Sequence, residues 1–157
     1  INEISIGYLH RVLAIFNATA QHVCEGQQLD MDFEKKQNLS FEEYVNMISL
    51  KTSVLLGSSL QTGAILGGAG LGNQQHLYAF GKNLGIAFQV QDDYLDAFGD
   101  PQKFGKQTGG DILANKKTFL LLHANAKALS ESEKAIPPCT IPKPLIISLR
   151  TVILIRL

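Results

Sequence analysis

The hydrophobic positions of the chain recur at intervals of three and four residues, which is the spacing of an amphipathic α-helix. Residues 4 to 24 show this spacing first, and Gly26 follows at a natural helix stop. Ser40, with Glu43 three residues later, has the form of a capping box and predicts a second helix that continues through Ile48. Because no segment before residue 136 alternates convincingly, the sequence predicts an all-α protein.

The middle of the chain predicts a turn followed by a long helix. The glycine-rich stretch GAILGGAGLG, residues 63 to 72, marks a turn or a close contact between helices. A third helix starts near Asn73 and ends at the residues Gly99 to Pro101, which are typical of a helix stop. A loop then runs to Gly110, and another helix extends from about Asp111 through Leu122.

Composition narrows the class of protein. Residues 52 to 75 carry no charge and are long enough to cross a bilayer, but polar residues and glycines interrupt them, which favours a buried helix over a membrane span. The 14 basic and 14 acidic residues cancel, so no global field favours nucleic acid. Cys24 and Cys139 lack CxxC spacing, which favours reduced thiols in a cytoplasmic protein.

The end of the chain follows a different pattern. Ser130 and Glu133 have the form of a helix start, but Pro137 and Pro138 would break that helix within two turns. The segment 136–157 is rich in Ile, Leu and Pro and contains no acidic residue. A β-strand, a poorly patterned helix and a translated frameshift all agree with it. We therefore interpret residues 1–135 as one domain and 136–157 as an atypical tail.

Four polar residues form one stripe on the third helix, because Gln89, Asp92, Asp93 and Asp96 fall at i, i+3, i+4 and i+7. An isolated acidic run is usually a solvated face. Here apolar residues cover most of the remaining circumference, which indicates a helix inside a bundle whose acids line an internal cavity. Mg²⁺ suits such a site, since it takes one or two carboxylates and leaves positions for water and phosphate. The absence of a nearby His or Cys in the sequence argues against zinc.

Lysines flank this stripe on both sides. Lys106, Lys116 and Lys117 surround a glycine-rich segment downstream, and Lys51 stands upstream at the edge of the uncharged stretch. A single lysine is usually an exposed solubilising charge, but the set indicates an anionic target. The segment is not a Walker A loop, because its spacing is one residue too long and Gln107 replaces Ser or Thr.

The ordered set EGQQLD, KT, FQVQDDYLD, GKQTGGD and NKKTF resembles the trans-type polyprenyl synthetases, the farnesyl and geranylgeranyl diphosphate synthase group. The resemblance covers roughly residues 10 to 128. It implies an isoprenoid synthase-like helical bundle and a homodimer. It also implies a Mg²⁺-dependent prenyltransferase that condenses an allylic diphosphate with isopentenyl diphosphate.

The same resemblance implies roles for individual residues. Asp92 matches the firmest Mg²⁺ ligand of the second aspartate-rich motif, with Asp93 and Asp96 supporting it directly or through water. The remaining matches concern the substrates. Lys51 and Thr52 match the pair that reaches the allylic diphosphate, and Gln89 matches the glutamine that faces the allylic substrate. Further matches are Lys106 and Lys116 as lysines of the active site, Phe88 lining the hydrocarbon part, and Gln27 and Asp30 as the upstream polar pair.

The sequence also departs from the family pattern. No first aspartate-rich motif stands between Ile1 and Phe88, and the basic patch for isopentenyl diphosphate is missing as well. We therefore expect the C-terminal half of a synthase, inactive alone, whose parent protein is an enzyme. A non-catalytic helical module that binds diphosphate or pairs with a synthase is the alternative. A terpene cyclase is less favoured, because the GK and NKKT elements are those of the elongating synthases.

Overall fold

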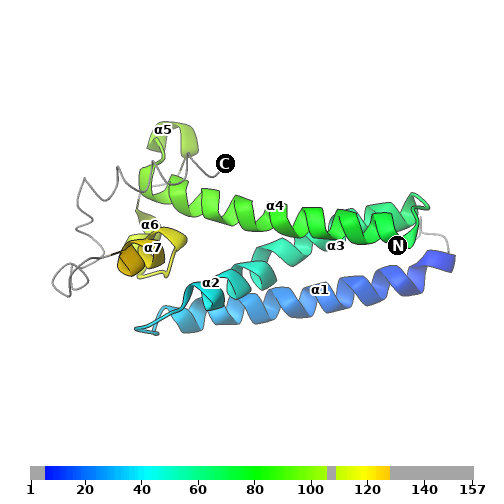
Figure 1. Cartoon of the computed structure of the whole chain (residues 1–157), viewed down its shortest axis with the longest axis horizontal. Coiled ribbons are helices and arrows are strands. Elements are labelled where there is room, and N and C mark those ends of the chain that lie inside the picture. Colours follow the sequence, from blue (N-terminus) through cyan, green and yellow to red (C-terminus); the bar gives the residue numbers. More distant parts are fainter. Residues whose placement is uncertain (1–5, 106–108, 128–157) are drawn as a thin grey trace. The chain divides into compact units, whose positions relative to one another are not determined.

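The computed structural model describes residues 6–105 and 109–127, and every regular element in those two ranges is a helix, which confirms the all-α prediction (Figure 1). Lys106 and the tail 136–157 lie outside the described residues. The helices are α1 (Ile6–Phe33), α2 (Phe41–Ile48), the π-helical turn η1 (Ser49–Ser53), α3 (Val54–Leu66), α4 (Leu71–Phe98), α5 (Pro101–Phe104), α6 (Gly110–Leu113) and α7 (Phe119–Lys127).

The chain divides into two compact units. The first unit consists of Ile1–Asp32 and Val45–Val90, and the second consists of Phe33–Tyr44 and Gln91–Leu157. The boundaries fall inside α1, α2 and α4, so each of these helices contributes residues to both units. Most of α1, η1, α3 and the first two thirds of α4 belong to the first unit.

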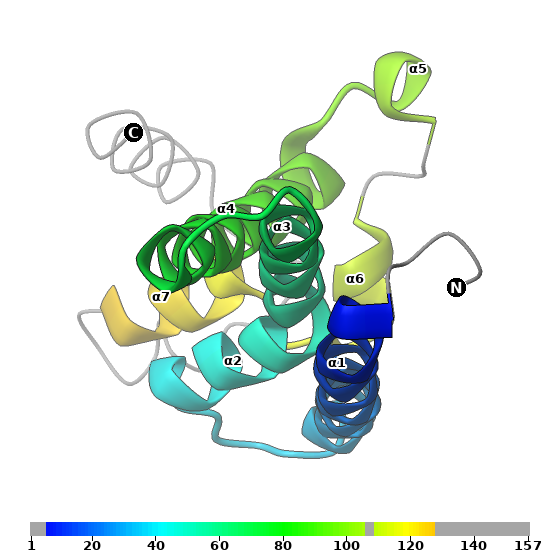
Figure 2. The ribbon, with the colours of Figure 1, turned by 90° about the vertical axis from the view of Figure 1, so that its right-hand side faces the viewer.

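Small residues bring α3 and α4 together in the first unit (Figures 1 and 2). A methyl group at Gly81 would lie 2.7 Å from the carbonyl oxygen of Leu56, and one at Gly85 would lie 2.5 Å from Cα of Ser53. Both approaches are too short for any side chain, so only glycine allows this packing. The uncharged stretch 52–75 covers the end of η1, α3, a turn and the start of α4, so it is not one buried helix, although α3 does pack through small residues. Among the described helices, none has the length and apolar character needed to cross a membrane.

Helix α1 continues seven residues beyond Gly26, so the predicted stop at that glycine is wrong. Gly26 is buried, and a methyl group there would overlap the backbone nitrogen of Lys51 and approach its Cα to 2.7 Å. The glycine therefore serves close packing of α1 against η1 instead of ending the helix. A glycine in a sequence allows either use, and only the neighbouring element decides between them.

The predicted capping box at the start of α2 is confirmed. The backbone N–H of Glu43 donates to Oγ of Ser40 at 3.1 Å, and the backbone N–H of Ser40 donates to Oε2 of Glu43 at 2.9 Å. Lys36 adds an ion pair with Glu43 at 2.5 Å. The hydrogen bond from Lys36 lowers the pKa of Glu43, with a further contribution from the Ser40 backbone. These contacts satisfy two donors that α2 leaves without helical partners.

The helix predicted from about Asp111 through Leu122 is in fact two helices, α6 and α7. Helix α6 ends in a Schellman arrangement, in which the N–H of Lys116 donates to the Asp111 carbonyl at 2.9 Å and that of Asn115 donates to Ile112 at 3.1 Å. Asn115 has φ of 56°, a left-handed conformation that asparagine tolerates better than most residues. Its side-chain amide also donates to the Glu34 carbonyl at 3.0 Å, which holds the break in place.

The core of the second unit forms where α7 meets residues of α2. The rings of Phe41 and Phe119 pack edge to face with centroids 5.5 Å apart, and Tyr44 and Leu120 are almost fully buried. Aromatic pairs in this geometry contribute about 0.5–1.5 kcal/mol beyond their buried area. This core fixes the start of α7, where the acidic stripe of α4 also makes contact.

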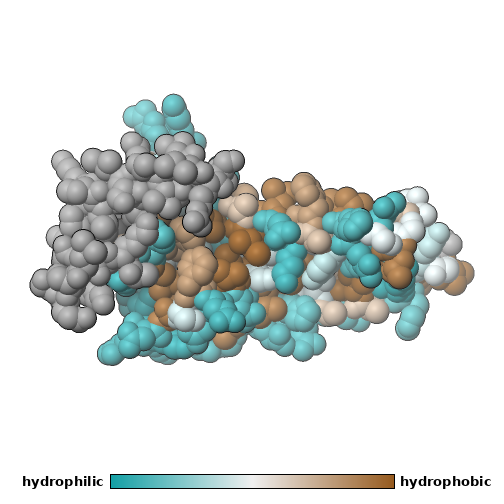
Figure 3. Space-filling model, in the orientation of Figure 1, coloured by the Kyte–Doolittle hydropathy of each residue, from teal (hydrophilic) through white to brown (hydrophobic). Residues whose placement is uncertain are grey.

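Several large apolar side chains of the first unit remain exposed, contrary to the prediction of a helix buried nearly all round. Phe80, Leu84 and Phe88 of α4 are 60%, 47% and 57% exposed, and Phe16 of α1 is 65% exposed. Figure 3 shows hydrophobic residues among the hydrophilic ones on the visible face of the long helices. The acids behave as predicted in one respect, because Asp93 and Asp96 are buried. These two aspartates of the stripe therefore face the protein interior, while several apolar side chains of the same helix face outward.

Candidate functional site

A first cluster of predicted residues is centred on Lys51, in the first unit. The Nζ atom of Lys51 lies 2.6 Å from Oδ2 of Asp30, so the upstream aspartate of the sequence analysis pairs with the upstream lysine. Both side chains are partly buried. Gln27 stands one turn earlier on α1 and is exposed. The packing of Gly26 against the Lys51 backbone brings α1 close enough for this ion pair.

Lys51 and Thr52 both belong to the π-helical turn η1, which no pattern in the sequence indicates. The N–H of Val54 donates to the carbonyl of Ser49, five residues earlier, and so closes this wider turn. The hydroxyl of Thr52 donates to Oε1 of Gln89 at 3.1 Å, so this pair links η1 to α4. Single π-helical turns inside α-helices occur frequently at functional sites.

A second cluster is built by the acidic stripe of α4, in the second unit. Asp93 is 5% exposed, and its Oδ2 atom accepts hydrogen bonds from the hydroxyl of Tyr44 at 2.6 Å and from the backbone N–H of Phe119 at 2.9 Å. Asp92, one position earlier, is partly exposed. Burial of Tyr44, together with the negative charge of Asp93, raises the pKa of its phenol. Tyr44 is therefore a neutral donor over the physiological pH range.

Asp96 contacts the segment that leads into α6. Its Oδ2 accepts the backbone N–H of Asp111 at 3.1 Å, and its own carbonyl accepts the N–H of Gly109 at 2.7 Å. A methyl group at Gly110 would lie 3.4 Å from Oδ1 of Asp96, so the chain passes close to the carboxylate there. The result is an aspartate pair, Asp96 and Asp111, at the N-terminus of α6.

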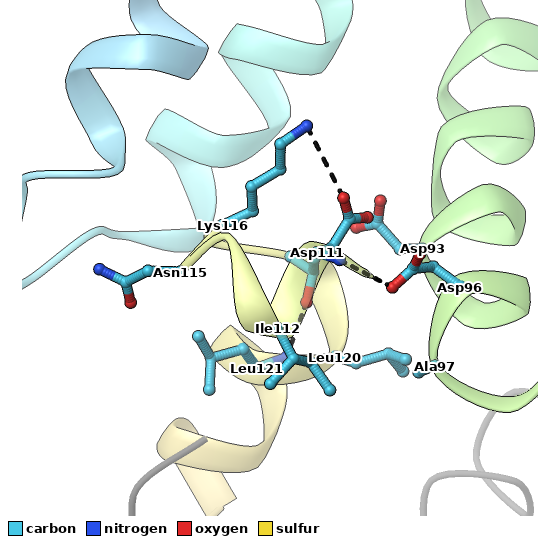
Figure 4. Close-up of a pocket in the computed structure, with 10 residues that line it drawn as sticks. Asp93, Asp96, Ala97, Asp111, Ile112, Asn115, Lys116, Leu120 and Leu121 are labelled. Carbon is cyan, nitrogen blue, oxygen red and sulfur yellow. Dashed lines mark hydrogen bonds and ion pairs between the residues drawn. The ribbon is translucent and has the colours of Figure 1, made fainter. Parts of the chain in front are cut away.

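Lys116 lies on the other side of Asp111, with Nζ 3.7 Å from Oδ1 (Figure 4). Burial and the charge of Asp96 raise the pKa of Asp111, while Lys116 opposes that change. These side chains line a cavity of about 20 Å³, which has room for roughly one water molecule and not for a diphosphate. The lining residues are Asp93, Asp96, Ala97, Asp111, Ile112, Asn115, Lys116, Thr118, Leu120 and Leu121.

The predicted residues thus fall into two sets. Lys51, Thr52, Gln89 and Asp30 meet in the first unit, whereas Asp93 and Asp96 line a cavity with Lys116 in the second. Phe88 is exposed, and its side chain has no place in either cluster.

Two further members of the second cluster, Asp111 and Tyr44, were not assigned a role from the sequence. Asp111 stands within the quoted GGD element, so its position beside the lysines was the available signal. Tyr44 occupies an apolar position of α2 and carried no signal of its own.

The donor set determines which metal ion these residues suit. Among the described residues, no group of three or more His, Cys, Asp or Glu side chains is arranged to hold a metal ion. Mg²⁺ needs only one or two carboxylates, with water and phosphate oxygens completing its octahedron. Asp92 and Asp96 fit that requirement, whereas Oδ2 of Asp93 already accepts two hydrogen bonds. The residues therefore fit a magnesium ion held by few carboxylates and not a cage of three.

Solved structures of prenyl synthases have the same arrangement of helices. The geranylgeranyl pyrophosphate synthetase of Pyrococcus horikoshii is 36% identical with a TM-score of 0.78, over 96% of this chain and 46% of that one. The geranylgeranyl pyrophosphate synthase of Corynebacterium glutamicum, solved with isoprenyl diphosphate and magnesium, is 30% identical with a TM-score of 0.77, over 92% and 42%. The chain has the all-helical isoprenoid synthase fold.

Sequence comparison gives the family. A profile of the polyprenyl synthetase family matches residues 2–140, and the chain belongs to that family. The short chain isoprenyl diphosphate synthase of Methanocaldococcus jannaschii is 42% identical over 125 residues, which are 80% of this chain and 38% of that protein. The chain thus spans less than half the length of each of these three relatives.

Proposed function

We propose that this chain carries part of the active site of a polyprenyl diphosphate synthase, a prenyltransferase that condenses an allylic diphosphate with isopentenyl diphosphate. One observation carries the proposal. Lys51 and Thr52 stand on a π-helical turn, and Thr52 is bonded to Gln89 on the same helix that bears Asp92 and Asp96. A cation and a hydroxyl on one turn, with a hydrogen bond from Thr52 to Gln89, support a phosphate-binding role for that turn.

The proposed chemistry begins with binding of the allylic diphosphate. Lys51 and Thr52 bind its phosphate oxygens, and Gln89 faces the allylic portion. As the carbon–oxygen bond breaks, negative charge develops on the leaving oxygens, and the preorganised ammonium of Lys51 stabilises it. Asp30 keeps that ammonium in place through their ion pair. In the second unit, Lys106 and Lys116 supply further positive charge.

Magnesium is the cofactor that we propose for this reaction. Asp92 and Asp96 would hold it, directly or through bound water, and Asp93 belongs to the same motif. When bound, Mg²⁺ supplies positive charge that neutralises the departing diphosphate. Support comes from the oxygen-only donor set and from the magnesium in the solved Corynebacterium glutamicum structure.

The apolar substrate chain requires a dry environment. Phe88 would line the hydrocarbon part of the site, because an allylic carbocation has to be kept from water. Phe88, Leu84 and Phe80 are exposed in the described residues, and we infer that further helices of the complete synthase fold cover them. Those helices would also supply the first aspartate-rich motif that is missing from this sequence.

We also propose a cytoplasmic homodimer. The cytoplasmic location is supported by Cys24, which is a free thiol. The dimer is what the family resemblance implies, and the exposed aliphatic and aromatic side chains of α1 support it.

The test is incorporation of labelled isopentenyl diphosphate into longer prenyl diphosphates, with and without Mg²⁺. Activity is expected when the rest of the synthase fold is supplied together with this chain. Under those conditions Asp92→Ala should reduce kcat by about 10² or more, since it removes charge stabilisation at the leaving group. Met31→Ala, an exposed position on α1, is the matched control and should retain activity. Full activity of the Asp92→Ala variant would remove the catalytic assignment.

A non-catalytic diphosphate-binding module is the second candidate. It rests on the sequence itself, in which neither the first aspartate-rich motif nor the basic patch for isopentenyl diphosphate is found. Calorimetry with magnesium pyrophosphate separates the two functions. Binding without any prenyl transfer, even when the rest of the fold is supplied, would favour the module.

A further inference from the structure

Two aspartates of α4 bind the backbone of one segment, residues 109–119. Asp96 accepts the N–H of Gly109 on its carbonyl at 2.7 Å and the N–H of Asp111 on its carboxylate at 3.1 Å. Asp93 accepts the N–H of Phe119 at 2.9 Å. The two aspartates therefore hold the segment near both of its ends, and between those ends lie Asp111 and Lys116.

The Asp93 carboxylate is engaged inside the protein and is not simply directed at a ligand. Its Oδ2 atom accepts two hydrogen bonds, from the Tyr44 hydroxyl and from the Phe119 N–H, and a carboxylate oxygen has two lone-pair sites. Tyr44 is 2% exposed and Asp93 is 5% exposed, so water does not compete for these bonds. Phe119 is the first residue of α7, where the backbone N–H has no helical partner and a negative charge is favourable.

We propose that Asp93 is a positioning residue and not a metal ligand, and that Tyr44 anchors it. Asp93 attaches the start of α7 to α4, which orients the 109–119 segment and so places Asp111 and Lys116 in the site. Metal ligation, directly or through bound water, then belongs to Asp92 and Asp96. The catalytic purpose of this positioning rests on the proposed function. The hydrogen bonds of Asp93 do not, because they need neither metal nor substrate.

The metal-free protein provides the first test. Hydrogen–deuterium exchange of the full 157-residue chain is measured in EDTA for wild type, Asp93→Ala, Asp93→Asn, Tyr44→Phe and the control Gln91→Ala, at an exposed position of α4. We expect the peptide covering residues 109–122 to exchange about tenfold faster in Asp93→Ala, because its amides lose a charged acceptor. The Asn variant should restore most of the protection, since its amide oxygen accepts the same bonds. Gln91→Ala should match wild type.

The outcomes of this test are distinct. Equal exchange in Asp93→Ala and wild type would overturn the proposal, and so would an equal rise in Gln91→Ala. The peptide of α3, Val54–Leu66, reports on global folding and should keep its protection. If Asp93→Ala unfolds throughout, Tyr44→Phe carries the test, with a smaller rise confined to residues 109–122. An unchanged Tyr44→Phe would then contradict the anchoring role.

Binding of magnesium pyrophosphate provides the second test, by calorimetry at several Mg²⁺ concentrations. A positioning role predicts that Asp93→Asn stays within about threefold of wild type, whereas Asp92→Asn loses about tenfold or more, because it removes a charged ligand. Equal losses in the two variants would make Asp93 a ligand and overturn the proposal. If wild type fails to bind even when the rest of the synthase fold is supplied, the proposed function fails, while the exchange experiment still decides the role of Asp93.

Discussion

The ammonium of Lys51 lies 2.6 Å from the carboxylate of Asp30, and this ion pair exists because α1 approaches η1 at a single glycine. Gly26 precedes Asp30 by about one helical turn, so the two residues face the same neighbour. A methyl group at Gly26 would clash with the backbone of Lys51. A flexible side chain could move out of the way, but the backbone of a packed helical turn cannot.

Gly26→Ala should therefore destabilise the protein by about 1–3 kcal/mol, because the added methyl forces α1 away from η1. The free energy of unfolding in urea measures this change. Gly63→Ala is the matched control, since Gly63 is also helical but a methyl group there meets nothing within 4 Å. The control should be neutral or stabilising by up to about 1 kcal/mol, and equal losses in both variants would contradict the packing explanation.

The hydrogen bond between Thr52 and Gln89 should appear as a coupling energy. In a double-mutant cycle of Thr52→Val and Gln89→Leu, we expect a coupling of about 0.5–1.5 kcal/mol, because the pair is partly buried and 3.1 Å apart. Urea denaturation of the four proteins gives the value. Additive effects would mean that the two side chains do not share a bond in solution.

The raised pKa of Tyr44 predicts a loss of stability at alkaline pH. The folded state keeps the phenol protonated above its ordinary pKa of 10.0, whereas the unfolded chain releases the proton there. The contribution is therefore complete below pH 10 and declines as the pH rises above it. Urea titrations from pH 7 to 11 should show a steeper decline for wild type than for Tyr44→Phe. The control Tyr8→Phe, at an exposed position, should follow wild type.

The capping box at α2 should contribute measurably to stability. Ser40→Ala is expected to cost about 0.5–2 kcal/mol, because the Glu43 N–H loses its acceptor. Ser59→Ala is the matched control, since this exposed serine bonds back to Leu55 inside α3 and caps nothing. Its effect should stay within about 0.5 kcal/mol, as measured by thermal or urea unfolding. If Ser59→Ala lowers the free energy of unfolding as much as Ser40→Ala does, the capping box does not stabilise α2 more than an ordinary serine contact.

Local signals were sufficient for much of the fold. The capping box at Ser40, the glycine-rich turn and the helix stop after Phe98 each depend on neighbours only a few residues away, and all three are confirmed. The length of α1 and the division between α6 and α7 were not predicted correctly. The first depends on η1 packing against Gly26, and the second depends on a bond from Asn115 to Glu34, 81 positions earlier.

The site shows the same division. The spacing on α4 correctly indicated that the acids turn inward, because helical periodicity is a local property. The pattern could not indicate that Asp93 would be bonded to Tyr44 and Phe119, which lie 49 and 26 positions away. Nor could it predict the π-helical turn at Lys51, since such turns depend on the packing of the surrounding helices and not on a residue pattern.

That turn makes the length of the chain near Lys51 as important as its chemistry. Two consecutive residues reach two different helices, Lys51 toward Asp30 on α1 and Thr52 toward Gln89 on α4. Removing one residue between Ile48 and Val54 would swing everything after it by roughly 100° about the helix axis. One of the two side chains would then face away from its partner, whichever residue type stood there. This short segment can therefore accept a change of side chain more easily than the loss of a residue.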